Sequence, residues 1–311
     1  MWLDLSLSIQ GLGNVKLEIP DKWVLAGEHS VSRDFRALAL PRNDINLTIE
    51  FESLDSGGLR FFPAQVANFI EPILTQLKKE DTWRKLLDGM HGRVFIYGNI
   101  PKEGGLGSSA AFCVGLVRLL AAFEPMSDRE ICALAAQLTN KLHGSSSRFD
   151  IAAVFYDEPV SLLTTQDREG LSSKVEVRKL SLKTLPHFTF HDAGLKSTVK
   201  DSVHLVEALE KKDAILASHL DEQMAFATSE AEQGLVEYAN DNRGQGLKRV
   251  ANAMRLAHEC FKAWGLLPQS VADLEQELLS QGALAVKLTG SGGRGTLVAL
   301  WPDEKVALRS Q

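Results

Sequence analysis

The N-terminal part of the chain alternates apolar and polar residues, the period-two pattern of β-strands. One apolar row occupies residues 3–9 and a second occupies residues 15–19. The triplet Gly11-Leu12-Gly13 between them predicts a hairpin. Short apolar runs bounded by turn-forming residues predict further strands at 22–25, 36–40, 45–51 and 94–97.

Helical spacing of apolar residues begins at Pro63 and predicts a helix to Lys79. Similar patterns predict helices at 81–90, 112–123 and 127–142, the last of them opened by a capping box between Ser127 and Glu130. After Asp150 the apolar runs are short again and predict strands at 152–156, 160–164, 175–180 and 188–191. Helices then fill most of residues 199–280, and a strand, a glycine turn and a strand cover 283–301.

This order of elements predicts an α+β protein with two domains. Strands and helices are mixed in the first half, whereas the second half is mostly helical with strands at its edges. We draw the boundary so that an N-terminal domain covers residues 1–175 and a C-terminal domain covers residues 176–311, a size that each domain can sustain with a core of its own.

Composition narrows the functional classes. The chain has 311 residues, 44% of them hydrophobic and 24% charged, with a net charge of −6. That charge indicates neither a nucleic-acid partner nor a membrane surface. The three cysteines share no metal-type spacing and indicate buried thiols in a reducing compartment. The first ten residues lack the basic start and apolar core of a signal peptide, so we expect a cytoplasmic protein.

The segment 102–111, KEGGLGSSAA, carries the chemistry that stands out most. It lies between a predicted strand and a predicted helix, so a glycine-rich loop opens a helix with Ser108 and Ser109 in its first turn. Glycines let a backbone approach a phosphate closely, and the unpaired N–H groups of a helix start face an anion. The alternative is a glycine turn with a serine N-cap and no ligand.

Two better-known phosphate motifs are excluded. The sequence has no GxxxxGK[ST], so it is not a P-loop enzyme. Residues 290–295 read GSGGRG and match GxGxxG, but they join two predicted strands and open no helix, which rejects a dinucleotide fold. A glycine turn that merely closes a hairpin is the simpler interpretation of this segment alone.

Taken together, the glycine-bearing segments resemble the GHMP kinase superfamily, and within it the mevalonate kinase group. The segments are DKWVLAGEHSV at 21–31, PKEGGLGSSAA at 101–111 and AVKLTGSGGRGT at 285–296. Two more stretches support the resemblance: HGSSSRFD at 143–150 and DAGLKSTVKDSV at 192–203. All five occur in the family's order over nearly the whole chain.

The resemblance implies a fold and a set of roles. The fold would be an N-terminal domain like ribosomal protein S5 domain 2 and a C-terminal ferredoxin-like domain, with the active site in the cleft between them. Asp150 matches the catalytic aspartate, and Lys22 the lysine beside it, whose charge favours the carboxylate form. The resemblance places ATP on Gly104, Gly105, Leu106, Gly107, Ser108, Ser109 and Ala110, with Ser109 on Mg²⁺. It places the acceptor substrate near Glu28, His29, Thr198, Gly290, Ser291 and Gly292.

Several residues depart from the family pattern. A Mg²⁺-binding glutamate is expected four residues before the His143-Gly144 pair, where this chain has Thr139. A neutral hydroxyl is a weak ligand for a hard cation, so Glu28 or Glu103 could supply the acid instead. Arg148 and Arg294 replace glycines. They could offset the charge of a phosphate on the substrate, or they could be surface residues.

The expected function is therefore an ATP-dependent kinase that phosphorylates a hydroxyl of a small molecule, with mevalonate as the first choice. The alternatives are another acceptor, such as a phosphorylated mevalonate, a sugar or a hydroxy acid, and a non-catalytic homologue that binds ATP. Related kinases are frequently dimers, but the sequence shows no stripe that demands a homodimer.

Overall fold

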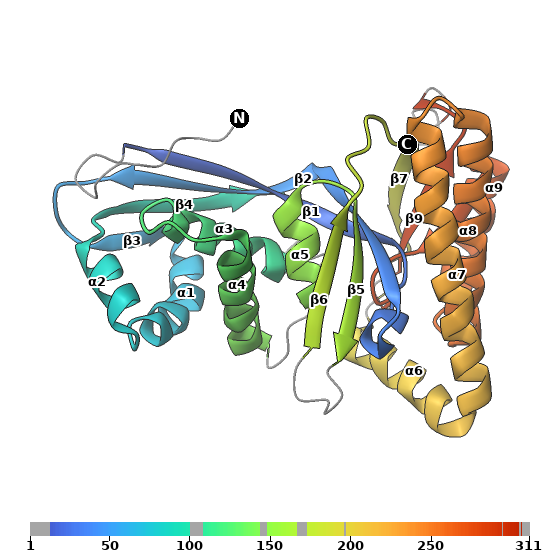
Figure 1. Cartoon of the computed structure of the whole chain (residues 1–311), viewed down its shortest axis with the longest axis horizontal. Helices are drawn as coiled ribbons and strands as arrows, with labels where there is room; N and C mark the ends of the chain where they lie inside the picture. The colour runs from blue at the N-terminus through green and yellow to red at the C-terminus, as the bar shows by residue number, and fades with distance from the viewer. Residues whose placement is uncertain are drawn as a thin grey trace. The chain divides into compact units, whose positions relative to one another are not determined.

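Strands and helices are mixed along the chain, as their sequence pattern predicts (Figure 1). The computed structural model describes residues 13–99, 108–143, 148–166, 173–195, 197–293, 295–304 and 306; the predicted strand at 3–9 lies outside them. The elements are β1 (Val15–Ala26), η1 (Ser30–Arg33), β2 (Arg36–Ser53), β3 (Leu59–Phe62), α1 (Ala64–Leu77), α2 (Asp81–Gly89), β4 (Gly92–Gly98), α3 (Ser108–Ala121), α4 (Asp128–His143), α5 (Arg148–Tyr156), β5 (Val160–Gln166), β6 (Ser173–Lys179), β7 (His187–Asp192), α6 (Val199–Lys212), α7 (Ala214–Ala239), α8 (Arg243–Ala263), α9 (Gln269–Ser280), β8 (Ala285–Leu288) and β9 (Thr296–Trp301).

The chain divides into two compact units, and each is discontinuous. Unit 1 comprises Met1–Lys22 and Pro41–Asp157, and unit 2 comprises Trp23–Leu40 and Glu158–Gln311. The units thus fall elsewhere than the division predicted at residues 175 and 176, which stays a prediction for the domains. The difference arises because β1 and β2 each contribute one part to unit 1 and the other part to unit 2.

Strand β2 corrects one prediction. Residues 36–40 and 45–51 were expected to form separate strands, because Pro41, Asn43 and Asp44 between them favour turns. The structure has one strand whose first part pairs with β5 (residues 36–39) and whose last part pairs with β4 (residues 47–53). Pro41 falls between these two pairings, so its missing N–H removes no hydrogen bond from either of them.

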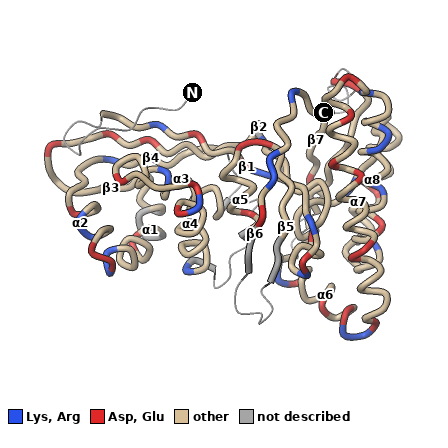
Figure 2. Tube along the Cα trace, in the orientation of Figure 1, with Lys and Arg blue, Asp and Glu red and all other residues tan. Residues whose placement is uncertain are grey.

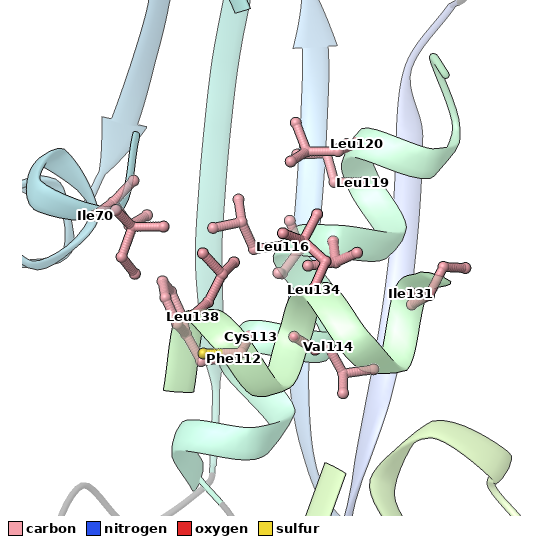
Figure 3. Packing of buried hydrophobic residues seen from close by; sticks show 14 of the residues in the cluster. Ile70, Phe112, Cys113, Val114, Leu116, Leu119, Leu120, Ile131, Leu134 and Leu138 are labelled. Carbon is pink, nitrogen blue, oxygen red and sulfur yellow. The ribbon is translucent and has the colours of Figure 1, made fainter. Parts of the chain in front are cut away.

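Unit 1 packs helices against the strands β2, β3 and β4. Strand β3 pairs parallel with β4, which pairs antiparallel with β2, and α1, α3 and α4 lie on the same side of these strands (Figure 1). Helix α3 is buried along most of its length. Its side chains meet Ile70 of α1 and Ile131, Leu134 and Leu138 of α4 in one hydrophobic core (Figure 3).

Helix α5 corrects a second prediction, since residues 152–156 were expected to form a strand. Every residue from Phe149 to Phe155 except Asp150 is buried. A short helix that is buried on all sides shows no apolar stripe, so its sequence resembles that of a buried strand. Its two adjacent alanines, Ala152 and Ala153, are strong helix formers, and the helix packs against α3 and α4.

Unit 2 contains a three-stranded sheet in the order β7-β9-β8, with both pairings antiparallel. The central strand β9 is almost wholly buried. The first part of β2 pairs with β5, which pairs with β6, and helices α6 to α9 complete the unit. The predicted helical stretch 199–280 is confirmed, with interruptions at residue 213, residues 240–242 and residues 264–268.

The long helices α7 and α8 form a pair of opposite charge. Helix α7 has acidic residues and no Lys or Arg, whereas α8 is rich in Arg and Lys (Figure 2). Arg249 of α8 pairs with both Glu230 and Glu237 of α7 at 2.9 and 3.1 Å. In the part of the chain that the structure describes, no helix is long and apolar enough to span a membrane.

Candidate active site

In unit 1, the structure brings together the two residues predicted to be catalytic. Lys22 lies near the middle of β1, and Asp150 lies in the first turn of α5. Lys22 Nζ forms an ion pair with Asp150 Oδ1 and lies 5.6 Å from the ring centroid of Phe149. The lysine side chain is 5% exposed and the aspartate side chain 35%. A buried cation thus holds a carboxylate that solvent and ligands can reach.

Asp21 is a third charged group at this place, and sequence reasoning missed it. Its side chain is fully buried. Oδ1 accepts a hydrogen bond from the Lys22 backbone N–H at 2.8 Å, while Oδ2 has no hydrogen-bond partner among the described residues. Desolvation raises the pKa of Asp21 to about 7, against the lowering effects of the Lys22 N–H and of the Lys22 and Arg42 charges.

A sequence signal for the burial of Asp21 did exist. Val15, Leu17 and Ile19 are the inward-facing residues of β1, and Asp21 continues this row at the same spacing of two. Alternation along the strand therefore predicts an inward-facing carboxylate directly beside Lys22.

The predicted phosphate site is described in part. The loop residues Gly104, Gly105, Leu106 and Gly107 lie outside the described residues. Helix α3 begins at Ser108, so both serines stand in its first turn as predicted; Ser109 is half-buried and Ala110 buried. The first turn of α3 contains no acidic residue. The positive end of this helix is therefore not neutralised from within and remains suited to an anion.

Thr139, at the place where a metal-binding glutamate was expected, is engaged inside its own helix. The residue is 6% exposed, and its hydroxyl donates to the Ala135 carbonyl at 2.8 Å. Within the described ranges, no group of three or more His, Cys, Asp or Glu residues could hold a metal ion. Glu103 lies outside these ranges.

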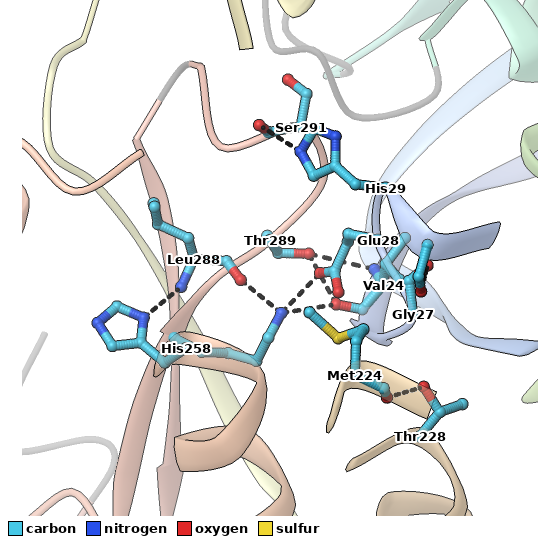
Figure 4. A network of polar contacts seen from close by, with 12 residues as sticks. Val24, Gly27, Glu28, His29, Met224, Thr228, His258, Leu288, Thr289 and Ser291 are labelled. Atoms are coloured by element: carbon cyan, nitrogen blue, oxygen red, sulfur yellow. Dashed lines mark hydrogen bonds and ion pairs between the residues drawn. The ribbon is translucent and has the colours of Figure 1, made fainter. Parts of the chain in front are cut away.

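In unit 2, the Gly-Glu-His segment forms a tight turn after β1. Gly27 has a φ of 101°, and a Cβ there would lie 2.4 Å from the Cα of Ala37, so only glycine fits. Glu28 points into the protein, where its Oε1 accepts a hydrogen bond from Lys287 Nζ at 2.6 Å (Figure 4). The Glu28 and Lys287 side chains are 3% and 0% exposed.

His29 is fixed by a hydrogen bond and by aromatic contacts. Its Nε2 lies 3.1 Å from the Ser291 carbonyl oxygen (Figure 4). Because a carbonyl only accepts, Nε2 carries the proton and Nδ1 is left as a hydrogen-bond acceptor. The ring packs edge-on against Phe261 and Trp264, with centroids 5.9 and 5.1 Å apart. Burial lowers the pKa of His29 to about 4, so the imidazole is neutral at pH 7.

The glycine loop at 290–295 joins β8 to β9, as predicted. Gly290, Gly292 and Gly295 have φ values of 69°, 80° and 73°, which L side chains rarely adopt. A Cβ at Gly293 would lie 2.7 Å from the Thr198 carbonyl oxygen, so the loop runs against the start of α6. The structure therefore places Thr198, Ser291 and His29 on neighbouring segments of unit 2. Arg294 lies outside the described residues, and so does the side chain of Arg148.

Thr198 also has a structural part that the sequence could have revealed. It is the N-cap of α6, where its hydroxyl accepts from the Asp201 N–H, and the Asp201 carboxylate accepts from the Thr198 N–H. The spacing of Thr198 and Asp201 is that of a capping box. Lys287, a lone charge in the apolar run of β8, is the other residue that sequence reasoning passed over.

Comparisons with known proteins bear on the family and the fold of this chain. A profile described as the GHMP kinases N terminal domain matches residues 68–158, and one described as GHMP kinases C terminal matches residues 235–309. The mevalonate kinase of Thermococcus sibiricus is 24% identical over 92% of this chain and 89% of its own length. That of Pyrococcus horikoshii is 26% identical over 92% and 88%.

Solved structures share the fold over nearly the whole chain. The L. major mevalonate kinase in complex with R-mevalonate matches with a TM-score of 0.76 at 20% identity, covering 95% of this chain and 90% of that one. The Lactococcus lactis galactokinase complexed with galactose matches with a TM-score of 0.67 at 16% identity, covering 95% and 87%. The same fold thus serves different acceptors, and the fold alone does not choose among them.

Proposed function

This chain belongs to the GHMP kinases, and on that premise we propose that it is an ATP-dependent kinase that phosphorylates a hydroxyl of a small molecule. Mevalonate is the first-choice acceptor. The sequence relatives that cover about nine-tenths of this chain carry the name mevalonate kinase, and this supports the choice more specifically than the fold does.

The ion pair between Lys22 and Asp150 carries the proposal. Phosphoryl transfer depends on positioning and charge neutralisation more than on covalent catalysis. The exposed part of the Asp150 carboxylate can accept the proton of the attacking hydroxyl. Lys22 is held by burial and by the Phe149 ring, so it keeps that carboxylate in a fixed place and offers an N–H donor to the acceptor oxygen.

ATP would bind with its phosphates at the start of α3. Mg²⁺ in kinases usually keeps several waters and takes only one or two protein oxygens besides the phosphates. The Ser109 hydroxyl in the first turn of α3 can supply one such protein oxygen, whereas the Thr139 hydroxyl donates to a carbonyl within α4. When bound, the ion would neutralise charge on the β- and γ-phosphates.

A non-catalytic ATP-binding homologue is the second candidate, and Thr139 is the observation that favours it. A threonine bound to its own helix replaces an expected acidic ligand. The acidic residues named as substitutes differ in placement: Glu28 is buried in an ion pair and Glu103 lies outside the described residues. Weak use of Mg²⁺ would follow if no other carboxylate serves.

We also propose a cytoplasmic location. Cys113, Cys132 and Cys260 are free thiols, with Cys113 and Cys260 buried, and this supports a reducing compartment. A homodimer remains an expectation from related kinases.

The first experiment is ADP release with Mg-ATP against mevalonate, its phosphates, galactose and homoserine. Turnover with mevalonate alone supports the proposal, and a Mg²⁺ titration then shows how strongly the metal is used. Turnover with another acceptor keeps the mechanism and changes the substrate. ATP binding without turnover on any acceptor supports the non-catalytic candidate.

Asp150→Asn is expected to lower kcat by about 10²- to 10⁴-fold, because the amide cannot accept the hydroxyl proton. The matched control is Asp88→Asn, which removes an exposed carboxylate paired with Lys78 in the same unit. We expect the control to keep full activity. Equal activity of the two variants would show that Asp150 is not the base.

A further inference from the structure

We propose that Lys287 is a positioning residue for acceptor binding: through the hydrogen bond from its ammonium to the Glu28 side chain it holds the 27–30 turn in a strained form that fixes the His29 ring. The inference rests on the proposed function, in which His29 lies near the acceptor. It concerns a side chain on β8 whose ammonium donates to Glu28, Val24 and Leu288.

The turn is strained at His29. This residue has a φ of 59° and a ψ of −45°, and the Ser30 N–H donates to the Glu28 carbonyl at 2.6 Å. A hydrogen bond that spans two residues around a centre with positive φ defines a γ-turn of the rare, strained kind. Strained residues persist only where their surroundings over-determine the conformation, and such places gather at functional sites.

Lys287 supplies the strongest of those surroundings. Its side chain is fully buried, and its ammonium donates to Glu28 Oε1 at 2.6 Å, to the Val24 carbonyl at 3.4 Å and to the Leu288 carbonyl. The three hydrogens of the ammonium therefore have three acceptors. Val24 lies in β1, which leads into the turn, and Glu28 lies in the turn itself. The cation therefore ties both segments to β8.

The same network reaches the His29 ring from the other side. Lys287 Nζ lies 5.3 Å from the centroid of Phe261, the ring that packs against His29. Two residues after Lys287, just past the end of β8, Thr289 Oγ1 donates to the Val24 carbonyl at 2.9 Å (Figure 4). The His29–Ser291 bond completes the connection. Strand β1 and the 27–30 turn are thus joined, at residues 24, 28 and 29, to β8 and the segment that follows it, at residues 287, 289 and 291.

Stability alone gives a poor account of this ion pair. Replacing a buried ion pair by apolar groups is often neutral or stabilising, because desolvating two charges offsets their attraction. A positioning role explains why a buried ion pair is kept next to a strained turn. In some proteins, buried polar and ionic groups contribute specificity of conformation rather than stability.

The test uses full-length protein with ¹³C-labelled histidine and follows the ring of His29 by NMR as pH is lowered. The chain has eight histidines, and His29→Gln assigns the signal. In the native protein the midpoint should lie near 4, against 6.5 for a free side chain. Arg33 and Asp221 are the charged groups that also act on His29, and neither is altered.

In Lys287→Met we expect the His29 midpoint to rise by at least one pH unit, because the released turn exposes the ring. The KM for the acceptor should rise at least tenfold, with the KM for ATP changed less than threefold. The Glu28→Gln/Lys287→Met double variant leaves no unpaired buried charge and should recover stability to urea without recovering the native midpoint. Recovery of both would overturn the proposal.

A second pair of variants serves if Lys287→Met does not fold. Glu28→Gln and Glu28→Met both remove the carboxylate charge, but only glutamine keeps an acceptor for Lys287 Nζ. We expect the native midpoint in the first and a raised one in the second; identical midpoints would refute the proposal.

Arg249→Met is the matched control, since it removes ion pairs between α7 and α8 in the same unit and should leave the midpoint near 4. The titration needs no turnover, so absence of kinase activity would count against the proposed function alone.

Discussion

At the scale of the residue, the charges around Lys22 are uneven. Asp150 forms an ion pair with the Lys22 ammonium through a carboxylate that is partly exposed. Asp21 is fully buried, and its carboxylate accepts a hydrogen bond from the Lys22 backbone N–H. Of these two carboxylates, only that of Asp150 is exposed to solvent, which stabilises a negative charge. Burial therefore raises the pKa of Asp21 to about 7, so this carboxyl is partly protonated near pH 7.

Asp21 should make the protein less stable as pH rises. Its pKa is about 7 when folded and close to the ordinary 3.8 when unfolded. Between about pH 4 and pH 7 the folded state therefore binds more protons, so the free energy of unfolding falls across this window and is level above it. Asp21→Asn mimics the protonated form and should be more stable than the native protein at pH 8, by up to about 4 kcal/mol.

Urea unfolding at pH 4, 6 and 8 checks this expectation. The stability difference between Asp21→Asn and the native protein should vanish near pH 4 and grow toward pH 8. Asp88→Asn, an exposed carboxylate of the same unit, should show no such growth. A difference that is constant with pH would mean that Asp21 titrates alike in the folded and unfolded states, and that its pKa is not raised by folding.

At the scale of the element, α3 has two tasks in one helix. Its first turn has unpaired N–H groups and the half-buried Ser109 at the predicted phosphate site, and the rest is buried in the core of unit 1. Close packing along the rest of the helix is needed to hold this first turn at a defined place. Gly115 provides this, since a Cβ there would lie 2.7 Å from Ile49 Cδ1 and 3.0 Å from Ile19 Cγ1.

Gly115→Ala should therefore destabilise the protein by about 1–3 kcal/mol, although alanine is the better helix former, because the added methyl overpacks the contact between α3 and the strands. Gly89→Ala in α2 is the control, since nothing lies within 4 Å of a Cβ there. It should be neutral or slightly stabilising. Urea unfolding measures both, and a stabilised Gly115→Ala variant would contradict the packing argument.

At the scale of the whole molecule, β1 and β2 belong to both units. The stretch Trp23–Leu40 crosses into unit 2 and contributes Trp23, Leu25, Leu38 and Leu40 to a core that also contains β9 and α8. A unit assembled from distant parts of the chain has few local contacts to guide it. Cutting the chain between residues 175 and 176 therefore removes residues that belong to the core of unit 2.

A fragment of residues 176–311 should not fold on its own, because it lacks those four core residues and strand β5. We expect no cooperative thermal transition by circular dichroism. Adding residues 1–175 as a second chain should restore a transition. A sharp transition in the fragment alone would instead support the domain boundary predicted at 175 and 176.

Local patterns alone determined much of this protein. Apolar spacing predicted α1, α2, α4 and the helical stretch 199–280, and short apolar runs predicted the strands around the glycine turn at 290–295. The five motifs in order indicated the GHMP kinase family, which the family profiles confirm. These features could be predicted because periodicity and turn chemistry are properties of adjacent residues.

Tertiary structure alone decided the rest. Helix α5 is surrounded by apolar neighbours and so shows no stripe, β2 continues through Pro41 because its two halves pair with different strands, and the units interleave along the chain. The same holds for Lys287, whose partner Glu28 is 259 residues away. Burial and pairing between distant segments set these outcomes, and neither is encoded in any single stretch of residues.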